Sequence, residues 1–220
     1  MTEAKMVPGR ATAMAWLRQA LADEVDELMR ANGFKRSARS VSYARAWGPG
    51  RQKVDFELII RPRYAPEAVQ VSLSASFVSA EIAAIARVML PDDDAEIVNK
   101  DVVQRSVLDQ IMRNPPVLKF TNEPESRKCV ALLRNWVESS VVPYLNARDS
   151  IENLVRLDRA SLVNDLESGF PRGHRPVVLA AMNEFLGNPG EALEMLDLAY
   201  PPGSQERSYY AQAFIALNGE

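Results

Sequence analysis

The chain has 220 residues, which is enough for one large domain or for one domain with a helical appendage. Its 47% hydrophobic residues allow a sizeable core, and its net charge of −3 argues against nucleic-acid binding over the whole surface. A single cysteine, Cys129, excludes an internal disulfide and a cysteine-based zinc site. The N-terminus lacks a basic stretch followed by an apolar run, and no run approaches the ~18–20 apolar residues of a membrane span, so we expect a cytoplasmic protein without a membrane partner.

The first predicted element is a helix over 12–31. Apolar residues recur there at helical spacing on one face, and acidic residues take most of the other face. Thr12 is suited to cap the N-terminus. Gly33 ends the helix, because glycine readily takes the left-handed conformation after a last turn, and Phe34 then folds back onto that turn.

Three strand-like runs follow, at 39–47, 53–61 and 69–77. The third run has the clearest alternation, with apolar residues on one face and glutamine or serine on the other. Gly48-Pro49-Gly50 and the proline-containing stretch 62–66 are turn signals between the runs. Short connections make neighbouring strands antiparallel, so we predict a β-meander whose apolar face is covered by the first helix.

The chain after residue 77 is predicted to be mostly helical. Ser79 is suited to cap a short helix. The stretch 101–112 is predicted to be helical, with a strand at its valine-rich start as the alternative, and 117–120 is predicted to be a short edge strand. Two further helices are predicted at 122–143 and 150–158.

Near the C-terminus, the sequence EFLGNPGEALEMLDLAYPP has the form of one tetratricopeptide-type hairpin. Gly187 lies at its turn, and Ala192 and Ala199 lie at its small packing positions. Such repeats normally need about three copies to be stable alone. We therefore predict an α+β fold with an antiparallel sheet in residues 1–160 and a helical tail, 161–220, packed on it.

The sequence LMRANGFKR, residues 28–36, is followed by an alternating strand from Arg39 and later by the step Val142-Pro143-Tyr144. In these residues the chain resembles a family of uncharacterised bacterial proteins that contain a domain of unknown function. The resemblance covers about residues 12–160 and implies an N-terminal helix ending in Gly-Phe-Lys, a strand meander and a helix that runs into a proline–aromatic step. Ser37-Ala38 departs from the glycine that the family tends to have there. The family implies no catalytic residues.

Three features of the sequence are candidates for a chemical site. His174 is the only histidine, so a histidine-dependent nucleophile would have to use it, but a solvated loop histidine is the commoner case. Cys129 lies on an apolar stripe, where a buried, inert thiol is more common than a nucleophile. Asp92-Asp93-Asp94 lacks the spacing of a calcium loop and is expected to be a solvated helix end. We therefore expect no catalytic residue, no metal and no cofactor.

The strongest functional signal is a charge asymmetry. Between Lys35 and Arg63 there are eight basic and two acidic residues, a net +6, so the rest of the chain carries −9. Arginine pairs well with carboxylate and phosphate, and interleaved aromatic rings could stack on a base. The segment could therefore bind an acidic protein or a nucleic acid. The alternative to both is that its charge protects exposed strand edges from aggregation. The candidate binding residues are Arg36, Arg39, Arg51, Lys53, Arg61 and Arg63, with Trp47 and Tyr64.

The sequence therefore favours a non-enzymatic protein that binds an acidic partner protein, as a bacterial immunity-type or adaptor protein does. This expectation is an association and does not follow from a catalytic motif. An RNA-binding or regulatory module that uses the basic sheet edge is the first alternative. An enzyme with an unrecognised carboxylate site is the second.

Overall fold

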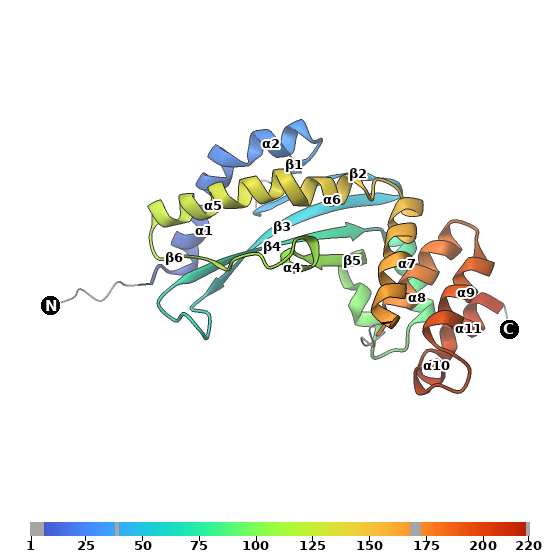
Figure 1. The fold of residues 1–220 in the computed structure, drawn as a ribbon. Helices are drawn as coiled ribbons and strands as arrows, with labels where there is room; N and C mark the ends of the chain where they lie inside the picture. The colour runs from blue at the N-terminus through green and yellow to red at the C-terminus, as the bar shows by residue number, and fades with distance from the viewer. Residues whose placement is uncertain (1–6, 38–39, 168–172, 219–220) are drawn as a thin grey trace. The chain divides into compact units, whose positions relative to one another are not determined.

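The computed structural model describes residues 7–37, 40–167 and 173–218 (Figure 1). The chain has an antiparallel sheet together with helices and a helical C-terminal part, which confirms the predicted α+β class. It divides into two compact units, each built from separate stretches of sequence. The first unit comprises Met1–Ala46, Gln52–Ser76 and Arg105–Asn146, and the second comprises Trp47–Arg51, Phe77–Gln104 and Ala147–Glu220. The predicted tail, 161–220, falls in the second unit with the stretch 77–104.

The sheet has six strands in the order β1-β2-β3-β4-β5, and β6 also pairs with β4. Lys35 lies opposite Ala44 in the antiparallel pair of β1 and β2, and Gln70 lies opposite Lys119 in that of β4 and β6. The three predicted strands and the predicted short strand at 117–120 are all present, whereas β1 was not predicted. The strands are β1 Lys35–Arg36, β2 Ser42–Trp47, β3 Gly50–Ile60, β4 Val69–Val78, β5 Val102–Val107 and β6 Leu118–Phe120.

The alternation along β3 explains why the strand forms a half-buried sheet layer. Val54, Phe56 and Leu58 are buried, and the residues between them are exposed or half-buried. At the start of β3, Gly50 meets another strand so closely that a Cβ atom would lie 1.9 Å from the carbonyl oxygen of Val78. Only glycine fits at this position.

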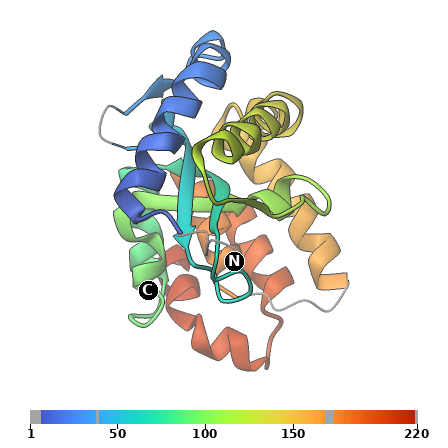
Figure 2. The same ribbon diagram turned by 90° about the vertical axis from the view of Figure 1, so that its left-hand side faces the viewer.

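Helices α1 and α5 pack against each other over one face of the sheet (Figures 1 and 2). The predicted single helix 12–31 is wrong in two respects. Thr12 does not cap it, because the helix begins at Arg10 and Gly9 takes the capping position with an extended backbone. Val25 takes φ −117° and divides the helix into two. Its predicted end is confirmed, since Gly33 has φ +81° and Phe34 N–H donates to the Met29 carbonyl oxygen at 2.9 Å. These helices are α1 Arg10–Glu24, α2 Asp26–Ala31 and α5 Glu123–Trp136.

The helix predicted over 122–143 was expected to end at Pro143, but the helical segment continues past it. A π-helical turn, Val137–Val141, is followed by α6, Val142–Asn146, which contains the proline. Proline has no N–H to donate within a helix, and a wider turn just before it is a common accommodation. Tyr144 of this step lies 2.8 Å from the Ser106 hydroxyl of β5.

The stretch 101–112 is not a continuous helix. It forms β5 and then the short helix α4, Leu108–Ile111, so the alternative of a strand at its start is correct. Val102, Val103 and Val107 are β-branched, and such residues favour an extended backbone. In contrast, the helix after Ser79 is confirmed as α3, Ala80–Met89, with the Ser79 hydroxyl accepting a hydrogen bond from the Ile82 N–H at 3.3 Å.

The second unit is mostly helical. Its α8 packs against α3, α7 and α9, and α8 with α9 forms the predicted hairpin. Ala192 and Ala199 are fully buried there, as their small size predicted. No helix within the described segments is long and apolar enough to cross a membrane. The helices of this part are α7 Ile151–Glu167, α8 Arg175–Phe185, α9 Pro189–Ala199, α10 Gln205–Tyr209 and α11 Ala211–Asn218, and a 3₁₀ helix covers Ala95–Asp101.

Candidate functional site

The sheet of the first unit has a polar face opposite the one that α1 and α5 cover. We call this the open face; it is formed by every second residue of β3 and β4. Lys53 and Asp55 form an ion pair on it at 3.2 Å. Arg105, from β5, joins the strands, because its guanidinium pairs with Glu57 and donates to the Ser74 hydroxyl at 3.2 Å. Most of the charge in the middle of this face is therefore paired.

A different arrangement occurs where the hairpin between β3 and β4 turns. Tyr64 is 60% exposed, and its hydroxyl donates to the Gln70 side-chain oxygen. The Lys119 ammonium lies 4.6 Å from the centre of the Tyr64 ring, a cation–π contact. Arg61 and Arg63 are exposed in the same turn. We call Arg61, Arg63, Tyr64 and Lys119 the basic hairpin end.

Sequence reasoning did not find Lys119, because it lies far along the chain from the basic segment. The antiparallel pairing of β6 with β4 brings it opposite Gln70. The prediction of a short edge strand at 117–120 was the one available signal. Two exposed aliphatic residues flank the cluster in sequence, since Ile59 is 45% exposed near the end of β3 and Val117 is 56% exposed just before β6. An aromatic ring, arginines and exposed aliphatic groups are the mixture that protein interfaces favour.

The other predicted basic residues do not join this cluster. Arg51 is the second residue of β3, which is 11 residues long and ends before Arg61. An extended strand of that length spans roughly 35 Å, so the two arginines lie near opposite ends of it. Lys53 is paired with Asp55. Arg39 lies outside the described residues.

Arg36 belongs to a separate hollow of about 330 Å³ beside α2 and β1. It pairs with Asp26 at 3.4 Å and donates to the Arg18 carbonyl oxygen at 3.1 Å. Lys35 and Arg36 lie on β1, which is an edge strand, so they fit the interpretation of edge protection. The residues that line the hollow are Asp26, Arg30, Phe34, Lys35, Arg36 and Tyr43.

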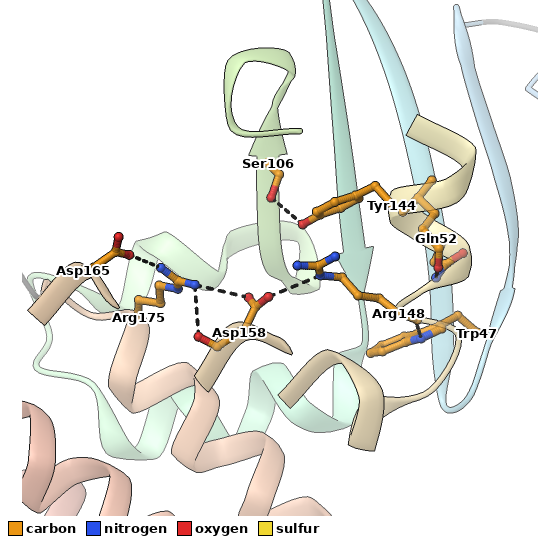
Figure 3. Close-up of polar contacts among 9 residues, drawn as sticks. Trp47, Gln52, Ser106, Tyr144, Arg148, Asp158, Asp165 and Arg175 are labelled. Carbon is orange, nitrogen blue, oxygen red and sulfur yellow. Dashed lines mark hydrogen bonds and ion pairs between the residues drawn. The ribbon is translucent and has the colours of Figure 1, made fainter. Parts of the chain in front are cut away.

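Trp47 does not contribute to any exposed binding surface. Its side chain is only 3% exposed, its indole N–H donates to the Arg148 carbonyl oxygen at 2.9 Å, and its ring packs edge-on against Phe77 (Figure 3). Tyr43 is also buried and donates to Asp26 at 2.6 Å, and its pKa is raised by burial. Of the three aromatic residues that lie within or next to the basic segment, Tyr43, Trp47 and Tyr64, Tyr64 alone is exposed.

A pocket of about 440 Å³ opens at the edge of β4 in the first unit. We call it the edge pocket. Sequence reasoning missed it, because its walls come from strands, α5 and the connection between β5 and β6. Its polar wall includes Glu57, Ser72 and Arg105, and its apolar wall includes Leu133 and Trp136.

A buried carboxylate, Asp158, lies in the second unit and is 2% exposed (Figure 3). Arg148 approaches one of its oxygens at 3.3 Å, and Arg175 approaches the other at 3.8 Å. The pKa of Asp158 is nevertheless raised, because desolvation by burial outweighs Arg175, Arg148 and a hydrogen bond from Gln104. Both carboxylate oxygens are engaged by cations, which is typical of a structural ion-pair centre.

The remaining predicted chemical sites have internal partners. Cys129 is buried, its thiol donates to the Lys119 carbonyl oxygen at 3.3 Å, and burial raises its pKa, so it stays a protonated, weakly reactive thiol. His174 is half-buried at the start of α8, not solvated as expected, and burial lowers its pKa. Asp94, the last of the acidic run, accepts a hydrogen bond from Tyr210 at 2.9 Å.

Within the described segments, no group of three or more His, Cys, Asp or Glu side chains is arranged to hold a metal ion. Comparisons with protein-family models, curated proteins and solved structures find no match to this chain.

Proposed function

We propose that this protein is a non-enzymatic binding protein, of the immunity or adaptor type, and that it holds an acidic partner protein at the basic hairpin end. The observation that carries the proposal is the exposed Tyr64 ring beneath Lys119, with Arg61 and Arg63 in the same turn. The proposal narrows the predicted basic segment to one end of it and adds a residue from β6.

The local positive charge at the basic hairpin end favours such a partner. Within the described residues, Arg61 and Arg63 have no acidic group at ion-pair distance. Their fields extend about one Debye length, ~8 Å at physiological salt, and can speed the approach of an acidic surface. Exposed Tyr64 adds a large, stiff contact area, which is the usual property of residues that dominate interface energies.

Two alternatives fit this end of the sheet less well. Proteins that bind single-stranded RNA commonly stack successive bases on several aromatic rings, but Tyr64 is the one exposed ring of the three considered, and Lys119 already lies over it. Edge protection applies to terminal strands, and β3 lies between β2 and β4. Arg61 and Arg63 themselves lie in the turn after β3, outside any strand.

The test uses two defined probes, a fluorescein-labelled glutamate-rich peptide and a labelled single-stranded RNA of equal length. Fluorescence anisotropy measures the affinity of the protein for each across a series of salt concentrations. The proposal expects the peptide to bind more tightly than the RNA. Tighter binding of the RNA would favour the nucleic-acid alternative, and no binding of either probe would refute both.

A matched pair of triple charge reversals localises the surface. The site variant should weaken peptide binding by about tenfold or more, chiefly through slower association, and the control variant by less than about threefold. Equal losses would mean that net charge alone, and no particular surface, governs binding. The site variant is Arg61→Glu with Arg63→Glu and Lys119→Glu, and the control is Arg10→Glu with Arg51→Glu and Lys128→Glu.

A further inference from the structure

The edge pocket exists because two strands share one side of β4. β3 pairs with one side of β4, so β5 and β6 both lie along the other. Between them the chain leaves the sheet, forms α4 and passes through Asn114-Pro115-Pro116 before it returns as β6. The pocket of about 440 Å³ lies in this gap, and its volume is within the range of sites for small molecules, roughly 300–1,000 Å³.

The pocket has two chemically different ends. Glu57, Ser72 and Arg105 belong to the open face of the sheet. Leu133 and Trp136 belong to α5, which covers the opposite face. The pocket is therefore lined by strand residues and by residues of α5. A ligand that fills it meets polar groups at one end and apolar groups at the other.

The charged residues of the pocket favour a ligand that carries one negative and one positive group. Arg105 and Glu57 form a half-exposed pair, with 49% and 51% of their side chains accessible. Asp109 also lines the pocket, so its walls carry one cation and two anions. A purely anionic ligand would meet an excess of negative charge, and an uncharged one would leave the pair without new partners. A carboxylate on the guanidinium and an ammonium near the two acids would add a partner of opposite charge to each of the three groups.

We infer that the edge pocket binds a free α-amino acid with a large apolar side chain. The carboxylate lies against Arg105, the ammonium lies near Glu57 and Asp109, and the side chain lies against Leu133 and Trp136. Each ligand group then meets a wall of matching chemistry. This inference is independent of the proposed partner surface, because it depends on different groups and a different ligand.

The test reads the three tryptophan side chains of the protein by NMR. In ¹⁵N-labelled protein, each indole N–H gives a separate resonance. L-phenylalanine should shift the resonance of Trp136 in a saturable manner. The resonance of Trp47 should not move, because that indole is buried and bonded to the Arg148 carbonyl oxygen. A Trp136→Phe variant assigns the signal.

Two analogues of phenylalanine decide the ligand class. 3-Phenylpropionate lacks the ammonium, and phenethylamine lacks the carboxylate. Both should bind at least about tenfold more weakly than phenylalanine, since each loses one charge-assisted contact. Equal binding of either analogue would overturn the zwitterion requirement. No saturable shift of Trp136 with any of the three compounds would overturn the site itself.

Substitutions of Arg105 and Glu57 test whether these two charged groups bind the ligand. Arg105→Gln and Glu57→Gln should each weaken phenylalanine binding about tenfold, and Arg105→Gln should also remove the preference for phenylalanine over phenethylamine. Arg127→Gln is the control, because Arg127 pairs with Glu123 at 3.2 Å in an equally exposed ion pair outside the pocket. An unchanged Trp47 resonance verifies that each variant is folded. A loss in the control as large as in the pocket variants would overturn the inference.

Discussion

The basic hairpin end and the Asp158 centre use the same residue type in opposite ways. Arg148 and Arg175 surround a buried carboxylate in the second unit, where their charges are satisfied within the chain. Arg61 and Arg63 are exposed and, within the described part of the chain, have no acidic group at ion-pair distance. A buried charge that loses its partner destabilises a fold strongly, whereas exposed, unpaired charge contributes little to stability and remains available to a partner. The contrast predicts that mutations at the two places separate stability from binding.

The largest expected effect comes from removing the helical tail. Truncation after Asp165 deletes α8, which packs on α3, a helix with four buried side chains. The truncated chain should lose solubility and the cooperative unfolding of the second unit, as measured by size-exclusion chromatography and thermal denaturation. A monomeric product with an unchanged Tm would contradict this.

The next largest effect is expected at the buried carboxylate. Asp158→Ala should lower the free energy of unfolding by about 3 kcal/mol, because it removes the buried carboxylate that Arg148 and Arg175 both approach, although Arg175 keeps its pair with Asp165 at 2.8 Å. Urea denaturation measures the loss. The control is Asp197→Ala, which removes an exposed ion pair with Arg207 at 2.6 Å and should cost less than about 1 kcal/mol. Equal losses would mean that burial does not set the strength of these pairs.

The pH dependence of Asp158 should be smaller and has a defined sign. Its pKa in the folded state is raised, so between the unfolded pKa, about 3.9, and the folded one, the folded state binds more protons. Stability from this group is therefore fully present below the unfolded pKa and is lost as pH rises through the folded pKa. Relative to Asp158→Asn, the wild-type protein should lose stability over that range in urea titrations. A relative gain would mean that the two arginines outweigh desolvation.

The smallest expected effect on stability is at the basic hairpin end. Arg61→Glu combined with Arg63→Glu should change the free energy of unfolding by less than about 0.5 kcal/mol, because exposed charges without partners contribute little. The same variant should bind the glutamate-rich peptide less well. A large loss of stability, measured by urea denaturation, would show that these arginines have a structural role.

Sequence patterns correctly predicted those helices and strands that are specified by a short stretch of neighbouring residues. The alternation in 69–77 gave β4, Ser79 gave the start of α3, and the small residues near Gly187 gave the hairpin of α8 and α9. Each signal arises from neighbouring residues that share a face or a turn.

The parts that sequence could not supply depend on contacts between distant segments. Trp47 was expected at a surface because it lies in a basic segment, but it is buried by Arg148 and Phe77, which come later in the chain. Lys119 reaches Tyr64 only through the pairing of β6 with β4. The gap between β5 and β6 that forms the edge pocket is likewise a property of strand order, which the period of a single strand does not encode.

The close approach at Gly50 restricts how this sequence can vary over evolution. Any other side chain would place a carbon within bonding range of the Val78 carbonyl oxygen, so even alanine would force the two segments apart. Gly48 in the same turn is restricted by its φ of +43° instead. Homologues that share this sheet should therefore keep glycine at position 50, and a random mutagenesis library selected for folded protein should show the same restriction.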